Sequence, residues 1–188
     1  PEVSIGQVCS IISDRHNEKV EAQVVGFRDH FVLLMALDSV HLIHPGCKVS
    51  SQRNNNSVPF GTSLLGRIID GMGRPLDGKG PLLAGRRDGF YAEPPNPLSR
   101  SMISEPFSTG IKSIDTFIPL GVGQRIGIFA GSGVGKSILL GMIAKGSDSD
   151  VNVISLVGER GRELREFVEK DLGEEGMKKT VIVVSTSD

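Results

Sequence analysis

The sequence predicts two folds in succession: a small N-terminal β-barrel, then an α/β domain built on a parallel sheet. Residues 1–58 contain short apolar runs separated by turn residues and show no helical period, which is typical of a small barrel. From residue 110 to residue 188, apolar runs alternate with helix-like segments, as in a parallel sheet joined by helices. Residues 59–109 are rich in Gly and Pro, so we expect a connector that runs over the surface of the second domain and leads into it. Composition alone is equally consistent with a flexible linker.

In the N-terminal part, alternation and turn residues predict the strands. Lys19 to Val25 alternates, and the apolar stretch Phe27–Leu37 surrounds a turn-like Arg28-Asp29-His30. Further short runs lie at Val3–Ile5, Val8–Ile12 and Cys47–Val49, with turn residues at Pro45-Gly46 and Asn54–Asn56. These runs predict antiparallel strands.

In the C-terminal part, we expect strands and helices to alternate. The predicted strands are Arg125–Phe129, Val151–Val157 and Thr180–Ser185. The predicted helices are Ile111–Phe117, Lys136–Lys145 and Gly161–Leu172. Because the strands are apolar on both faces, they predict a sheet covered on each side.

Composition excludes some classes of protein. The 188 residues have a formal net charge of -1 and 38% hydrophobic residues, which argues against a general nucleic-acid or membrane-surface binder. Cys9 and Cys47 are the only cysteines, so a reduced cytosolic setting is the default. The chain starts at Pro1 and stops just after a strand-like run, so we expect a piece of a longer protein.

The segment from Ala130 to Ser137 carries the clearest chemistry. It contains Gly131, Ser132, Gly133, Val134 and Gly135, then Lys136 and Ser137. Between a strand and a helix, such glycines let backbone N–H groups converge on phosphate oxygens, which Lys136 neutralises. The Ser137 hydroxyl can bind Mg²⁺. The segment therefore predicts an ATP and Mg²⁺ site; the alternative is a Gly-rich turn with an exposed lysine.

Glu159 is the candidate carboxylate. It follows the predicted strand Val151–Val157, and ligands lie at the carboxyl ends of parallel strands. It can therefore orient a water that attacks the γ-phosphate, or simply stabilise a helix N-terminus. Arg160 is its neighbour, whereas Arg162 and Arg165, with Glu163, Glu166 and Glu169, fit a solvated helix face.

Several motifs together resemble one family. They are Leu65–Asp77, Pro97–Arg100, Thr109–Asp115, the phosphate loop and Gly158-Glu159-Arg160. In this order they resemble the rotary-type hexameric ATPases, and most closely the ATPases of flagellar and type III protein export. The sequence of residues 123–137 is similar to that of the flagellar branch.

The resemblance implies a fold, an activity and partners. It implies that residues 1–58 are the N-terminal β-barrel without its first strand, and that the remainder begins a RecA-like P-loop domain. It implies ATP hydrolysis with Glu159 as catalytic carboxylate and Arg160 beside it. It also implies a homo-hexamer that works with stalk and stator subunits and export chaperone–substrate complexes. Such a motor is cytoplasmic and peripheral at the inner face of the membrane, near the export gate.

The family's second magnesium motif is an apolar strand that ends directly in Asp. Here Val181–Val184 is followed by Ser185–Ser187 before Asp188, so the spacing differs. We expect that motif, the adenine pocket and the arginine finger to lie outside this chain. An arginine finger can contribute about 10³ to 10⁵ in turnover, so we expect this chain alone to bind nucleotide weakly and to turn over negligibly.

Two other functions remain open. One is a non-hydrolysing nucleotide-binding subunit of a rotary ATPase hexamer, against which the presence of Glu159 argues. The other is an RNA-translocating hexamer, for which the barrel offers neither a basic stripe nor aromatic stacking residues. We therefore expect no nucleic-acid partner.

Overall fold

The structure is a computed structural model that describes residues 3–13, 18–51, 57–83, 85–89, 92–131 and 133–186. The chain divides into two compact units. Unit 1 comprises Pro1–Val58 and Asp88–Tyr91, and unit 2 comprises Pro59–Arg87 and Ala92–Asp188. None of the helices in the described ranges combines the length and apolarity that a bilayer span requires.

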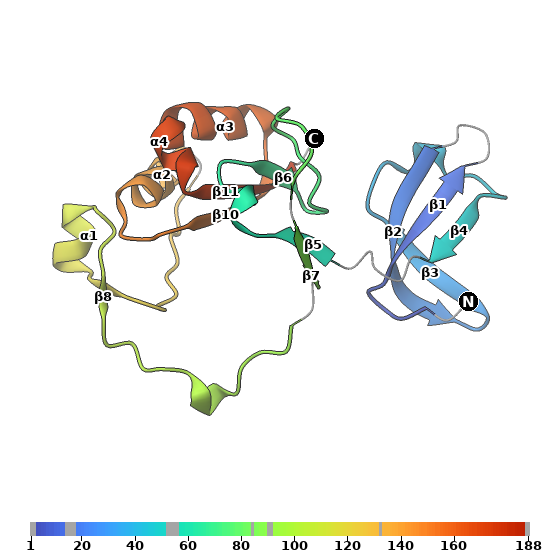
Figure 1. Cartoon of the computed structure of the whole chain (residues 1–188), viewed down its shortest axis with the longest axis horizontal. Helices are drawn as coiled ribbons and strands as arrows, with labels where there is room; N and C mark the ends of the chain where they lie inside the picture. Colours follow the sequence, from blue (N-terminus) through green and yellow to red (C-terminus); the bar gives the residue numbers. More distant parts are fainter. Residues whose placement is uncertain are drawn as a thin grey trace. The chain divides into compact units, whose positions relative to one another are not determined.

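Unit 1 is an antiparallel sheet (Figure 1). Its strands, in the order β3-β2-β1-β4, are β1 (Val8–Ser13), β2 (Glu18–Arg28), β3 (Phe31–Ala36) and β4 (Lys48–Ser51). The tight turn between β2 and β3 places Asp29 at φ 52, a conformation that Asp tolerates better than most residues. The predicted hairpin around residues 28–30 is therefore confirmed.

A cluster of buried apolar side chains forms a core in unit 1. Ile11, Val20 and Ala22 are buried there, and the partly buried side chains of Leu34 and Ala36 pack against them. The 3₁₀ turn η1 (Val40–Leu42) lies between β3 and β4 in the chain. Among the described strands the sheet does not close, because β3 and β4 end the order without pairing with each other. The predicted Asn54–Asn56 turn lies outside the described residues.

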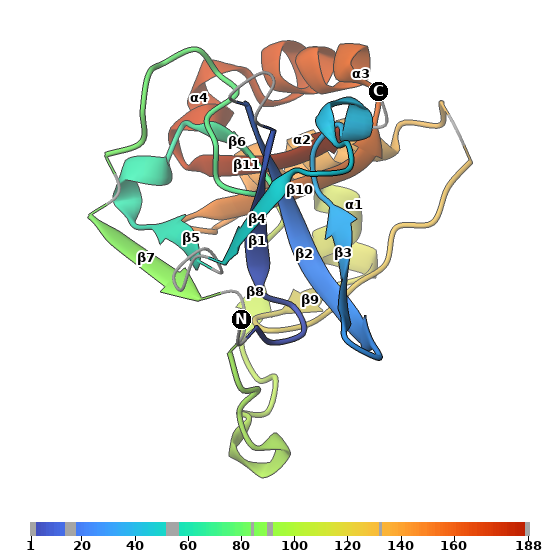
Figure 2. The same cartoon turned by 90° about the vertical axis from the view of Figure 1, so that its right-hand side faces the viewer.

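The main sheet of unit 2 is parallel (Figures 1 and 2). Its order is β10-β11-β6, with β10 (Asn152–Glu159), β11 (Thr180–Thr186) and β6 (Ile68–Asp70). The first two strands are those that the sequence predicts near Val151 and Thr180. The third was not predicted as a strand, since it lies within the Gly- and Pro-rich connector. Both views draw β6 beside β11, which agrees with the pairing of Val183 with Ile69.

The remaining elements of residues 57–186 are short. They are β5 (Ser57–Phe60), η2 (Thr62–Leu64), β7 (Arg86–Gly89), η3 (Pro97–Ser99), β8 (Pro106–Phe107), α1 (Lys112–Phe117), β9 (Leu120–Gly121), α2 (Lys136–Gly146), α3 (Gly161–Glu166), the π-helix η4 (Phe167–Leu172) and α4 (Gly173–Lys178). Helices α1 and α2 confirm the predicted ones. The predicted helix Gly161–Leu172 is α-helical only in its first half and a π-helix in its second.

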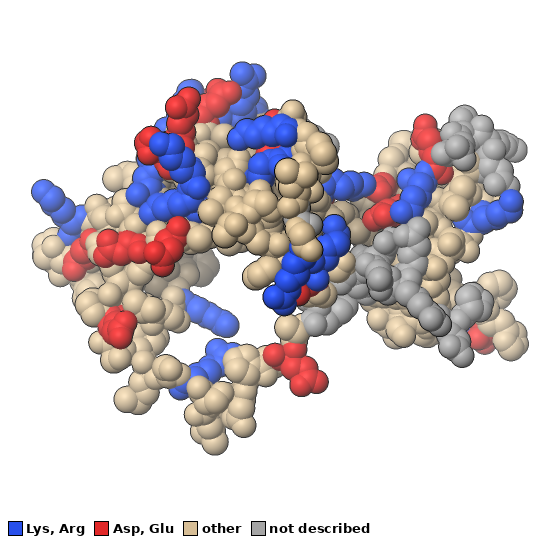
Figure 3. All heavy atoms as spheres, viewed as in Figure 1, with Lys and Arg blue, Asp and Glu red and all other residues tan. Residues whose placement is uncertain are grey.

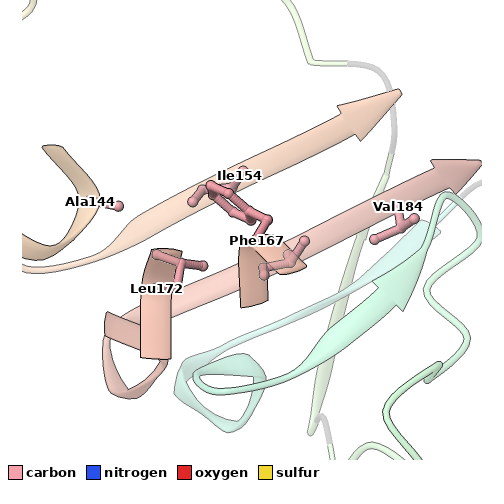
Figure 4. Close-up of a cluster of buried hydrophobic side chains, with 6 residues drawn as sticks. Ala144, Ile154, Phe167, Leu172 and Val184 are labelled. Atoms are coloured by element: carbon pink, nitrogen blue, oxygen red, sulfur yellow. The ribbon is translucent and has the colours of Figure 1, made fainter. Parts of the chain in front are cut away.

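A cluster of apolar side chains joins helices and sheet in unit 2 (Figure 4). Ile154 of β10 and Ile182 of β11 are buried against Ala144 of α2 and against Phe167 and Leu172 of η4. Gly141 allows the close approach, because a Cβ there would lie 2.8 Å from the Cβ of Asp171. This packing holds α2, and with it the loop before α2, against β10, β11 and η4.

Two expectations about the sheet were wrong. Residues 125–129 form no strand: among the described residues none pairs with them, and Ile126 and Phe129 are 50% and 97% exposed. An extended run without a hydrogen-bonded neighbour is not stable as a strand. The sheet is also not covered on each side, since Val153 and Val157 of β10 are 71% and 75% exposed.

Candidate nucleotide-binding site

The loop before α2 forms an open backbone concavity. Gly133 and Gly135 have φ angles of 76° and 96°, which residues with a side chain rarely adopt. A Cβ on either glycine, or on Gly131, would meet nothing within 4 Å. The loop ends at Gly135, the N-cap of α2, where the first N–H groups of a helix lack intrahelical partners and attract anions.

This concavity opens into a cleft of about 540 Å³, which we call the phosphate cleft. The described residues that line it are Ala130, Gly131, Gly133, Gly135, Lys136, Ser137, Ile138, Glu159, Glu163, Glu166 and Asp171. The structure thus brings together the loop glycines, Lys136, Ser137 and Glu159, as the sequence predicts. A cation, a hydroxyl and a carboxylate facing free amides form the donor set that a phosphate–metal complex requires.

Glu159 reaches this cleft through a β-bulge. The parallel register of β10 with β11 shifts between Val157 and Glu159. Between them Gly158 adopts φ 72, which a glycine does without strain. Bulges re-aim the side chains that follow them and are common beside active sites. The bulge accounts for the presence of Glu159 in the cleft at the end of its strand.

Two of the predicted site residues do not line the cleft, and a third cannot be placed. Arg160 is not among the described residues that line the cleft; its side chain is 79% exposed and its Nη1 lies 3.4 Å from Glu163 Oε1. Val134 is 67% exposed and does not line the cleft. Ser132 lies outside the described residues.

Sequence reasoning missed three acidic residues of the cleft. Glu163 and Glu166 were assigned to a solvated helix face, and Asp171 was not considered. The spacing of Glu163 and Glu166 was the available signal for these two, because residues three apart share one face of a helix. Asp171 reaches the cleft through the π-helix η4, for which the sequence held no such signal. Only part of that helix face is solvated, where the exposed side chains of Arg165 and Glu169 pair at 2.7 Å. Figure 3 shows acidic and basic side chains intermingled on the surface of the molecule.

An apolar hollow of about 530 Å³ lies beside the phosphate cleft. Ile126 and Ile128 line one part of it, and Leu156, Leu164 and Phe167 line another. It shares Lys136, Ser137, Glu159 and Glu163 with the phosphate cleft. The sequence did not reveal this hollow, because residues 125–129 were expected to be a paired strand.

The residues present fit Mg²⁺ bound together with a nucleotide. Among the described residues no three His, Cys, Asp or Glu side chains converge to hold a metal by themselves. Mg²⁺ characteristically takes few protein ligands and completes its shell with phosphate and water. Ser137 is the residue that would bind the ion, and Lys136 with the loop amides would hold the phosphates. The bound ion would neutralise phosphate charge.

Comparison with known proteins identifies the family. Residues 110–188 match the model of the ATP synthase alpha/beta family, nucleotide-binding domain. The flagellum-specific ATP synthases of Borreliella burgdorferi and Bacillus subtilis are 50% and 51% identical to the whole chain. Residues 110–188 therefore carry the nucleotide-binding domain of this family. The chain spans 43% of the length of each of these two relatives.

A solved structure shares the fold of this chain. The assembled ATPase EscN, in complex with its central stalk EscO from the type III secretion system of enteropathogenic E. coli, matches all of this chain and 45% of EscN. The TM-score is 0.87 and the sequence identity is 41%. The antiparallel sheet followed by a parallel sheet with a P-loop is therefore an architecture that EscN also has.

Proposed function

We propose that this chain is the nucleotide-binding part of an ATPase that energises the export of flagellar or type III secretion proteins. One observation carries the proposal: the amide-rich loop, Lys136 and Glu159 line the same cleft. The names of the relatives support it, since they are flagellum-specific ATP synthases and a type III secretion ATPase.

Each residue has a role in the proposed hydrolysis. Lys136 and the loop amides hold the β- and γ-phosphates, and Ser137 binds Mg²⁺. Glu159 lies at the strand end and orients the attacking water. Arg160 is a neighbour of Glu159 in sequence. It is 79% exposed and contacts Glu163, which lines the phosphate cleft, so we assign it to the edge of the cleft and not to the proposed chemistry.

The same relatives support a proposal for the assembly of the whole protein. EscN is described as assembled and bound to a central stalk, and we propose that the whole protein containing this chain forms a homo-hexamer around a stalk subunit. Stator subunits, chaperone–substrate complexes and a position at the inner membrane face belong to the same proposal.

The test is Mg²⁺-dependent phosphate release by the whole protein and by its Glu159→Gln variant. We expect the substitution to lower kcat by about 10²- to 10⁴-fold and to leave nucleotide binding within a few-fold. Glu174→Gln, an exposed change on α4, is the control and should keep kcat. A wild-type protein that binds nucleotide but releases no phosphate above the Lys136→Ala background would instead be a non-hydrolysing subunit.

A further inference from the structure

The phosphate cleft carries an excess of negative charge. Glu159, Glu163, Glu166 and Asp171 line it, and Lys136 is the only cation among its described lining residues. Asp and Glu carboxylates are ionised at neutral pH. Arg160 and Lys170 pair with Glu163 and Glu166 from outside the lining. Because both pairs are exposed to solvent, they offset the acidic charge only in part.

This balance acts differently on the two forms of a nucleoside triphosphate. The free molecule carries about four negative charges, and its Mg²⁺ complex carries about two, because the ion neutralises phosphate oxygens. Repulsion grows in proportion to the ligand charge. The acidic wall therefore penalises the metal-free form about twice as much as the Mg²⁺ complex.

Glu166 is the wall residue whose charge can be changed most cleanly. It is the last residue of α3, its side chain is 54% exposed, and Lys170 Nζ lies 3.6 Å from its Oε1. Lys170 is not among the described residues that line the cleft. An exposed pair of this kind contributes little to stability, so removing the Glu166 charge should not disturb the fold.

The other wall residues are less suitable. Asp171 is half-buried and its Cβ lies against Gly141 of α2, so a substitution there would disturb packing. Glu163 contacts Arg160, and Glu159 is the proposed catalytic carboxylate. Glu166 has no part in the chemistry proposed above.

We propose that Glu166 is a specificity-determining residue that disfavours metal-free nucleotide, so that the cleft takes up the Mg²⁺ complex. The inference rests on the proposed function, because it requires a nucleotide in the phosphate cleft. Glu166 acts through the electric field of its carboxylate and has no role in the proposed hydrolysis itself.

The experiment measures binding of a fluorescent ATP analogue to this chain, once with excess Mg²⁺ and once with EDTA. Wild type is compared with Glu166→Gln and with Glu175→Gln. Glu175 is the matched control because it also pairs with a lysine, Lys178, yet lies on α4 outside the cleft lining.

We expect Glu166→Gln to raise the affinity for metal-free nucleotide by about 3-fold and that for the Mg²⁺ complex by less than about 2-fold. Glu175→Gln should change neither. The gain should disappear at about 1 M NaCl, where the Debye length falls to about 3 Å. A purely structural effect would not depend on salt in this way.

Three results would overturn the inference alone: equal gains in Mg²⁺ and EDTA, a gain that persists at high salt, or the same gain in Glu175→Gln. A wild-type chain whose binding in Mg²⁺ equals that of Lys136→Ala would overturn the proposed function, and this inference with it.

Discussion

The guanidinium of Arg67 and the carboxylate of Asp77 form two parallel hydrogen bonds, Nε to Oδ2 at 2.6 Å and Nη2 to Oδ1 at 3.0 Å. Both side chains are nearly buried, at 12% and 4% exposure. Asp77 Oδ2 also accepts the N–H of Ile68, the first residue of β6, at 3.2 Å. The ion pair therefore links the start of β6 to the segment around Asp77.

Low pH should reduce the contribution of the Arg67–Asp77 pair to stability. The hydrogen bonds from Arg67 lower the pKa of Asp77 from 3.8 to about 2. Because the folded state binds the proton less tightly, the stabilisation is complete above about pH 4 and is lost as the pH falls towards 2 and below. It amounts to about 2 kcal/mol. Amide exchange of β6, measured between pH 7 and pH 2, should show the loss.

Asp77→Asn should lower the stability of β6 by about 2 kcal/mol at neutral pH and remove most of this acid dependence. Asp150→Asn, an exposed change in the same unit, provides the comparison. If Asp77→Asn kept the full acid dependence of the wild type, the pair would not be its source.

Gly110→Ala should destabilise unit 2 by at least about 3 kcal/mol. Gly110 has φ 74, and an added Cβ would lie 2.4 Å from the carbonyl oxygen of Gly146, at the end of α2. Gly123→Ala is the matched control, because Gly123 has φ 87 but open space around it. It should cost only the backbone strain, about 1 to 2 kcal/mol. Equal urea midpoints for the two variants would refute the close contact.

Ile182→Ala should cost about 2 to 5 kcal/mol, because Ile182 is fully buried at the centre of the parallel sheet and its loss leaves a cavity. Val153→Ala, on the neighbouring strand, should stay within about 0.5 kcal/mol, since Val153 is 71% exposed. Thermal unfolding of the two variants measures the contrast. A large loss in Val153→Ala would mean that its face of β10 is covered in solution.

Much of the fold follows from local pattern. The alternation of Lys19–Val25 and the continuous apolar run Thr180–Val184 carried enough signal to place β2 and β11. The glycines at 133 and 135 marked the loop, because few other residues adopt its backbone angles. Glu159 could be placed in the cleft because a strand end and a phosphate loop meet at one edge of a parallel sheet.

The errors arose where structure depends on distant partners. Ile68–Asp70 is too short to show a period, and only its pairing with β11 makes it a strand. Arg125–Phe129 has the composition of a strand but lacks a partner among the described residues. The π-helix η4 brings Asp171 to the cleft, and no residue pattern predicts such a change of helical period.

The central claim is that the loop before α2 holds a nucleotide through Lys136. Equilibrium binding of the Mg²⁺–ATP complex to this chain, compared with Lys136→Ala and Lys145→Ala, tests it most directly. Lys145 is an exposed cation at the other end of α2, so it controls for loss of charge. We predict weak binding that Lys136→Ala reduces about 10-fold or more and Lys145→Ala leaves unchanged. Equal binding by wild type and Lys136→Ala would contradict the claim.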